Sequence, residues 1–349
     1  MNCLLFVSVT IAYAFDLRNS AKQKRPCRQA FTALKFSQKP TVESSVDSAY
    51  NQQFLDVAVG HIQATFDGAL AFVTVDVDRR RLESLRRHVL PGKMLRTRLG
   101  LALCPQGSGD QDAVARACAA TELIHTATLY HDDVIDGASL RRQQPTLWQE
   151  VGQTGAILLG DLFFSSAIEL LLDGADLNQA RLFVARVKEV CATETIHEMV
   201  FQGRTVDAET CIAIARGKTG ALFAFVAECC GKDATMAKAM AEAGYRVGTA
   251  YQLADDLLDE IGVEQLAGKT LGTDRKRRKF TLAQQVGSSD NVVLTEISRL
   301  CGSAIELLRP WPVYADRLDS YITTHLAPAW EMHLQSTGGD RFSVDSAGC

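Results

Sequence analysis

The stretch Glu122-Leu-Ile-His-Thr-Ala-Thr-Leu-Tyr-His-Asp132-Asp133-Val-Ile-Asp136 joins a long apolar run to three aspartates. Its length and apolar content predict a buried helix, and Asp132 and Asp136, four residues apart, fall on one face of that helix. The same arrangement returns in Tyr251-Gln252-Leu-Ala-Asp255-Asp256-Leu-Leu-Asp259. A single copy could be a solvated helix end, but like charges on an apolar helix repel each other and require a compensating cation. Two copies therefore predict a functional site on a helical fold.

The chemistry that these carboxylates favour is the binding of a hard cation. Carboxylates without a His or Cys cluster suit Mg²⁺, which proteins commonly hold with a few carboxylates and the phosphate oxygens of a substrate. The substrate is therefore expected to be a diphosphate. The predicted metal ligands are Asp132, Asp133, Asp136, Asp255, Asp256 and Asp259.

Basic residues that could bind phosphate occur around both acidic motifs. Arg offers a two-pronged contact to phosphate and Lys a point charge. Any one of these residues alone would be read as an ordinary surface charge, but their order around the two motifs favours phosphate binding. They are Lys93 and Arg96, Arg141 and Arg142, Lys218 beside Thr219, and Lys269 and Lys279.

The composition is that of a globular protein. Of the 349 residues, 47% are hydrophobic and 22% are charged, which is enough to form a sizeable core. A net charge of -4 gives no support for nucleic-acid binding. The ten cysteines contain no C-x-x-C pair and are predicted to be reduced thiols.

The spacing of apolar residues predicts an all-α domain. From about residue 45 to 333 they recur at helical intervals, without alternating strands joined by hairpin signals. We expect one domain over residues 46–334 and a flexible tail over 335–349, which is rich in Gly and Ser.

Residues 1–45 form an N-terminal extension whose role stays open. An apolar run over 3–15 ends in a small-x-small pattern, is too short to span a bilayer, and is followed by a basic stretch. A disordered extension, an organellar transit peptide and a secretory signal all fit this composition. We expect no transmembrane segment and a cytoplasmic protein, or an organellar one if the extension is a transit peptide.

Together these motifs resemble those of the trans-isoprenyl diphosphate synthases, over about residues 85–285. The matching elements are Gly92-Lys93-x-x-Arg96, Asp132-Asp133-x-x-Asp136 followed by Arg141-Arg142, Lys218-Thr219, Gln252-x-x-Asp255-Asp256-x-x-Asp259, and Gly268-Lys269 with Gly272-x-Asp274 and Lys279. The resemblance implies an isoprenoid synthase-type helical bundle around a central cavity, with Mg²⁺ as cofactor. It also implies a homodimer that joins isopentenyl diphosphate to an allylic diphosphate.

The resemblance further implies a role for each matching residue. Asp132, Asp133, Asp136 and Asp255 would bind Mg²⁺, with Asp256 and Asp259 in support. Arg141, Lys218 and Lys269 would bind the allylic diphosphate, supported by Lys279. Lys93, Arg96, His125 and Arg142 would bind isopentenyl diphosphate, while Thr219 and Gln252 would line the carbocation.

Some positions depart from the family pattern, and three other functions are alternatives to it. Pro91, Met94, Thr97 and Gln143 replace the usual residues, but none of these changes removes a predicted phosphate ligand. A class I terpene cyclase would need no site for isopentenyl diphosphate. A non-catalytic subunit of a synthase would be expected to lose aspartates, and a purely structural bundle would need none.

Small residues one turn before Asp132 bear on product length. Ala127 and Thr128 stand where short-chain members of the family carry bulky aromatics, so the resemblance implies a tunnel that continues toward Ile124 and Thr121. We expect a product longer than C20, in the range C30 to C40, with geranylgeranyl or farnesyl diphosphate as the alternative. A close helix contact at Ala127 is the other reading. Candidates for the floor of the tunnel are Phe163, Phe164 and Leu171.

Overall fold

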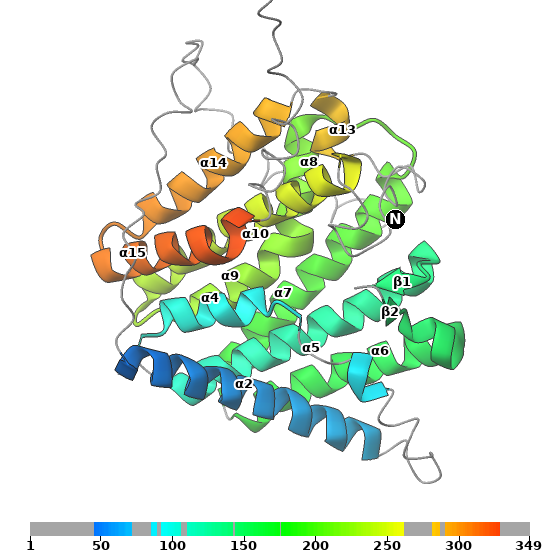
Figure 1. The fold of residues 1–349 in the computed structure, drawn as a ribbon, viewed down its shortest axis with the longest axis horizontal. Coiled ribbons are helices and arrows are strands. Elements are labelled where there is room, and N and C mark those ends of the chain that lie inside the picture. Colours follow the sequence, from blue (N-terminus) through cyan, green and yellow to red (C-terminus); the bar gives the residue numbers. More distant parts are fainter. Residues whose placement is uncertain are drawn as a thin grey trace, which may run out of the picture. The chain divides into compact units, whose positions relative to one another are not determined.

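Helices form nearly all of the secondary structure that is described (Figure 1). The computed structural model describes residues 45–71, 85–88, 92–105, 110–141, 144–174, 176–261, 281–286 and 290–328, all within the unit Glu43–Cys349. The α-helices are α2 (Ser45–Ala71), α4 (Leu95–Leu103), α5 (Gln111–Asp136), α6 (Leu147–Asp173), α7 (Leu177–Ile196), α8 (Ala208–Ala215), α9 (Ala221–Cys229), α10 (Ala234–Ile261), α13 (Leu282–Val286), α14 (Asp290–Leu307) and α15 (Pro312–Tyr321). Three π-helical turns, η2 (His197–Phe201), η3 (Arg216–Gly220) and η4 (Ile322–Leu326), continue α7, α8 and α15.

The residues on either side of α5 determine where the helix begins and ends. The Asp110 carboxylate accepts a hydrogen bond from the Ala113 amide at 3.0 Å and so caps the first turn. Gly137 ends the helix in the left-handed conformation, with φ 62°, which costs glycine little. The helix therefore stops directly after Asp136, and the first acidic motif occupies its last turn.

The core of the bundle lies where α9 meets its neighbours. Every residue from Ala221 to Ala227 is buried, and α9 packs against α4, α5, α7 and α10. The ring of Phe225 lies 5.0 Å from that of Phe183 on α7. Helices η3 and α10 approach so closely that a Cβ atom on Gly248 would lie 2.7 Å from the Cα atom of Gly220. Glycine at position 248 permits this approach. The prediction of an all-α fold is confirmed.

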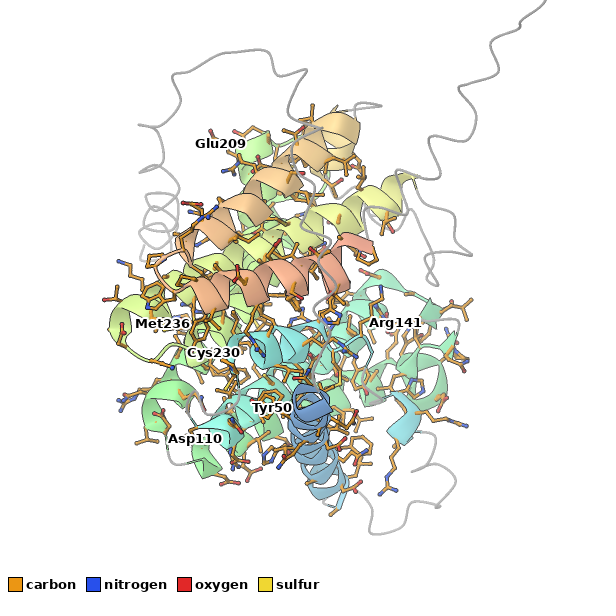
Figure 2. The ribbon with its side chains drawn as sticks, turned by 60° about the vertical axis from the view of Figure 1, so that its left-hand side comes forward. Tyr50, Asp110, Arg141, Glu209, Cys230 and Met236 are labelled. Atoms are coloured by element: carbon orange, nitrogen blue, oxygen red, sulfur yellow. The ribbon has the colours of Figure 1, made fainter. Side chains whose placement is uncertain are left out.

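A short hairpin contains the only β-strands among the described residues. Strands β1 (Leu140–Arg141) and β2 (Gln144–Pro145) pair antiparallel directly after α5. This hairpin was not predicted, because two residues are too few to show the alternation typical of a strand. It carries Arg141, which Figure 2 labels.

Two helical segments, Leu147–Asp173 and Ala208–Cys229, are long and apolar enough to cross a membrane by length and composition alone. Core helices of a bundle meet the same criterion, and α6 packs along α5 while α9 packs along α10. The expected absence of a transmembrane segment therefore stays a prediction.

Candidate active site

The first acidic motif contains a buried ion pair. Asp133 is 3% exposed, and its carboxylate accepts hydrogen bonds from Arg141 Nε at 2.9 Å and from Arg141 Nη2 at 2.7 Å. Burial raises the pKa of the Asp133 carboxyl, and the contact with Arg141 acts against that rise. Asp132 and Asp136 lie half-buried on either side. The hairpin thus brings Arg141 to the aspartates of the first motif.

A pocket lies beside this ion pair, between α5, the end of α2 and the start of α6. Its lining includes Gly92, His125, Tyr130, Asp133 and Arg141. His125 is a predicted isopentenyl diphosphate residue and Asp133 belongs to the first acidic motif, so the pocket lies between these two parts of the predicted site. Lys93 itself is exposed next to it.

Arg96 lies deeper than a surface phosphate ligand would. It is 8% exposed, and its guanidinium carbon lies 5.1 Å from the centre of the Phe223 ring. Burial lowers the pKa of this guanidinium, while the nearby charge of Glu122 opposes the change. Among the described residues, no hydrogen-bond partner reaches its buried Nε atom. A buried cation with an unused donor suits an anionic ligand that arrives later.

Glu122 was not predicted as a site residue, yet it organises the start of α4. Its Oε1 atom accepts hydrogen bonds from the Thr97 amide at 3.3 Å and from the Thr97 hydroxyl at 3.1 Å. Thr97 stands where the family pattern has proline, which has no amide hydrogen to donate. The signal in the sequence was an acidic residue on the apolar run that leads to Asp132.

The Lys-Thr pair and the second acidic motif are joined by hydrogen bonds. The Thr219 hydroxyl donates to Gln252 Oε1, and Gln252 Nε2 donates to Asp256 Oδ1 at 2.7 Å. Lys218 Nζ lies 2.9 Å from a carboxylate oxygen of Glu194 on α7, a second acidic residue that the sequence analysis did not single out. The turn η3 therefore holds both predicted residues against α7 and α10.

The aspartates of both motifs lie at corresponding ends of their helices. In Figure 1, α5 and α10 both run from left to right, so the two C-terminal ends lie on the same side of the bundle. Asp259 is buried and Asp255 and Asp256 are half-buried. Within the described residues no group of three or more His, Cys, Asp or Glu side chains is already gathered as a metal cluster. The donors are nevertheless all carboxylate oxygens, which fit Mg²⁺ and a bridging diphosphate.

Of the two predicted product-length residues, Ala127 lies on the packed side of α5 and Thr128 is half-buried. Ala127 is fully buried, and the Thr128 hydroxyl donates to the His125 carbonyl at 2.9 Å. One turn later, the ring of Tyr130 lies 5.9 Å from the ring of Phe163 on α6, which stacks on Phe66 at 5.4 Å. Among the floor candidates, Phe163 thus packs against this part of α5.

Three predicted substrate residues, Arg142, Lys269 and Lys279, lie outside the described residues. None of the described cysteines forms a disulfide. Burial raises the pKa of the Cys118 and Cys230 thiols, which disfavours the reactive thiolate.

The chain is similar in sequence to known prenyl diphosphate synthases. The chain is 35% identical over 203 residues to a geranylgeranyl diphosphate synthase of Mycobacterium tuberculosis, covering 55% of this chain and 57% of that protein. It is 28% identical to the octaprenyl diphosphate synthase of Escherichia coli, covering 63% of this chain and 70% of that protein. With the first of these relatives, the match thus spans little more than half of the relative's length.

Solved structures share the fold. A polyprenyl synthase from Caulobacter crescentus, solved with calcium and isoprenyl diphosphate, superposes with a TM-score of 0.63. The alignment has 24% identity and covers 78% of this chain and 98% of that one. The fold is therefore that of the isoprenoid synthases, as predicted. The family model for polyprenyl synthetases matches residues 79–292, more than half of the chain. Fold, motifs and this match lead to one conclusion: the chain belongs to the polyprenyl synthetase family.

Proposed function

We propose that this protein is a Mg²⁺-dependent trans-prenyltransferase that condenses isopentenyl diphosphate with an allylic diphosphate. The observation that carries the proposal is the hydrogen-bonded chain from Thr219 through Gln252 to Asp256, next to Lys218. It joins a cation, a polar pair and a carboxylate from two separate helices. Such a set suits a diphosphate whose carbon end becomes cationic.

The charges that would stabilise the departing diphosphate come from several elements. Mg²⁺, when bound by Asp132, Asp136 and Asp255 with the neighbouring aspartates, would neutralise negative charge on the leaving group. Lys218 and Arg141 are paired with Glu194 and Asp133, which keep both cations oriented before a substrate arrives. Fixed charges of this kind stabilise developing charge with little reorganisation.

The second substrate would occupy the side of α5 that carries His125. Arg96, Lys93 and His125 would bind the diphosphate of isopentenyl diphosphate, and its double bond would attack the allylic cation. Loss of a proton then gives the extended product. The apolar surroundings of α5 and α9 would exclude the water that quenches such a cation.

We further propose a product longer than C20, in the range C30 to C40. The support is Ala127, a small and fully buried side chain on α5, where short-chain members of the resembled family carry bulky aromatics. The two relatives named above are a geranylgeranyl and an octaprenyl diphosphate synthase, so their names favour neither a short nor a long product. Geranylgeranyl or farnesyl diphosphate is the alternative product.

One product assay tests both proposals. The purified full chain would be given Mg²⁺, isopentenyl diphosphate and farnesyl diphosphate, and the products would be identified by mass spectrometry. A series of prenyl diphosphates is expected. A cyclic hydrocarbon would instead indicate a terpene cyclase, and no product without a partner protein would indicate a non-catalytic subunit.

The length proposal has its own variant. Ala127→Phe inserts a ring beside Tyr130 and should shorten the product to C15 or C20 while turnover persists. Wild-type product that already ends at C15, or a long product unchanged in the variant, would overturn it.

A further inference from the structure

The π turn η3 places neighbouring side chains on opposite sides of the helix. Arg216 begins the turn and extends to α10, where it contacts Glu242 and Tyr245. Lys218, two residues later, reaches Glu194 on α7. A π turn contains one residue more than an α turn, so its side chains do not follow the usual 100° spacing. The turn thus directs Arg216 to α10 and Lys218 to α7.

Arg216 makes two kinds of contact with one face of α10. Its Nη2 atom lies 2.6 Å from Glu242 Oε2, and its guanidinium carbon lies 3.8 Å from the centre of the Tyr245 ring. Glu242 and Tyr245 are three residues apart and so share a face of the helix. A planar guanidinium can pair with a carboxylate and stack on an aromatic ring at the same time, which a lysine cannot do.

The Tyr245 ring on which Arg216 stacks is held in place by hydrogen bonds to its hydroxyl group. The Tyr245 hydroxyl donates to Glu189 and accepts a hydrogen bond from Arg186 Nη1 at 2.6 Å. Arg186 Nη2 in turn donates to Glu228 at 2.7 Å. Tyr245 is thus braced by α7 and α9 and provides a rigid support for Arg216.

The turn has little free space on its other sides. A Cβ atom on Gly217 would lie 2.2 Å from Thr193 Oγ1, and one on Gly220 would lie 2.9 Å from the Tyr245 carbonyl oxygen. The backbone of η3 is therefore in direct contact with α7 and α10. Any shift at Arg216 would be passed to Lys218 and Thr219 within the same turn.

We propose that Arg216 is a positioning residue that fixes the π turn and thereby sets where Lys218 and Thr219 meet the allylic substrate. This inference rests on the proposed function, which assigns those two residues to that substrate. Arg216 and Glu242 are each about one third exposed, at 37% and 35%, so their ion pair contributes little to global stability. Its effect is on geometry.

The chain offers a matched control in Arg246. Its Nε atom donates to the same Glu242 carboxylate at 3.0 Å, but Arg246 lies on α10 and anchors to the Ser303 carbonyl, away from the turn. Arg216→Met and Arg246→Met each remove one cation from Glu242. Only the first removes the anchor of η3.

The test compares both variants with the wild type in two measurements on the full chain. Amide hydrogen exchange of the peptide covering 214–222 reports opening of the turn directly. Steady-state kinetics give kcat and the KM for each substrate. We expect Arg216→Met to speed exchange in that peptide and to lower kcat/KM for the allylic diphosphate about tenfold or more. KM for isopentenyl diphosphate should stay within about twofold, because Arg96 and His125 lie on other helices.

The control sharpens the result. Arg246→Met should shift the melting temperature to a similar extent while leaving exchange of this peptide and the allylic KM at wild-type values. Equal effects of the two variants, or unchanged exchange in Arg216→Met, would overturn the inference. A wild type that forms no prenyl product would refute the proposed function instead, and the exchange data alone would still decide whether Arg216 holds the turn.

Discussion

Asp133 differs from the other aspartates of its motif because its carboxylate already binds a cation within the protein. Its two-pronged contact with Arg141 orients that guanidinium toward the end of α5. Asp132 and Asp136 share a face and are half-buried, so they are the better candidates for direct metal ligands. The three aspartates thus have two different tasks.

Replacing a predicted metal ligand should separate activity from folding. Asp132→Ala or Asp255→Ala is expected to lower turnover by at least about 100-fold, because each removes charge that a bound metal requires. Circular dichroism and melting temperature should stay near wild type, since removing one carboxylate relieves repulsion within its motif. Near-normal turnover of either variant would show that the metal assignment is wrong.

The two predicted substrate sites should respond to different residues. Arg96→Ala is expected to raise KM for isopentenyl diphosphate more than KM for the allylic substrate, and Lys218→Ala to do the reverse. Arg96→Ala should also lower the melting temperature, because it leaves a void beside Phe223 and Glu122 without a nearby cation. Initial rates with each substrate varied in turn would measure both constants. Equal effects on both substrates would refute the residue assignments.

At the scale of elements, the close approach of η3 to α10 depends on glycine. Gly248→Ala would set a methyl group 2.7 Å from the Gly220 Cα atom and 3.0 Å from the Phe223 ring. We expect a loss of about 1–3 kcal/mol in the free energy of unfolding and a clear loss of activity. Gly60→Ala on α2 is the matched control, because nothing lies within 4 Å of its Cβ position. That variant should gain up to about 1 kcal/mol from helix propensity, and urea unfolding would measure both.

The contact between η3 and α10 should also depend on pH. Burial raises the pKa of the Glu242 carboxyl, but the hydrogen bonds and charges of Arg216 and Arg246 outweigh it, and the pKa is lowered from 4.5. A carboxyl whose pKa is lowered on folding stabilises the protein at pH values above its pKa in the unfolded chain. This contribution is lost as the pH falls through its pKa in the folded protein.

Glu242→Gln should therefore melt about 1–4 °C below the wild type at pH 7. The difference should shrink as the pH falls below 4.5. Glu306→Gln is a control, because its ion pair with Arg309 is mostly exposed. A melting difference for Glu242→Gln that is the same at every pH would contradict the assignment.

For the whole molecule, exposed apolar side chains suggest where two copies of the chain could associate. Large apolar side chains lie exposed on α6 and α7, among them Leu158, Leu172, Leu177 and Val184. Exposed apolar side chains that gather into a patch often mark an interface. We propose that a second copy of this chain covers them, so the protein should sediment as a dimer at micromolar concentration. A charged residue at Leu158 should shift the equilibrium toward monomer, and a monomeric wild type would exclude the proposal.

Much of this molecule could be predicted from its sequence, because its helices follow the apolar period and its site lies at helix ends. The all-α fold and the position of both acidic motifs on helices follow from local features, whereas the pairing of Arg141 with Asp133 depends on a hairpin that was not predicted. Glu122 and Glu194 could not be assigned, since their partners Thr97 and Lys218 are 24 or more residues away and such contacts leave no local pattern. The burial of Arg96 was missed for the same reason.

The π turn that holds Lys218 also has a genetic consequence. One surplus residue puts the faces of α8 and α9 out of phase by about 100°. Loss of a single codon, for instance that of Gly217, would restore an ordinary helix without disturbing the reading frame. Every predicted substrate residue would remain in the sequence, yet Lys218 could no longer reach Glu194 on α7 while Thr219 bonds Gln252 on α10. In this segment the count of residues matters as much as their identity, and an alignment gap of one position should be read as a change in the site.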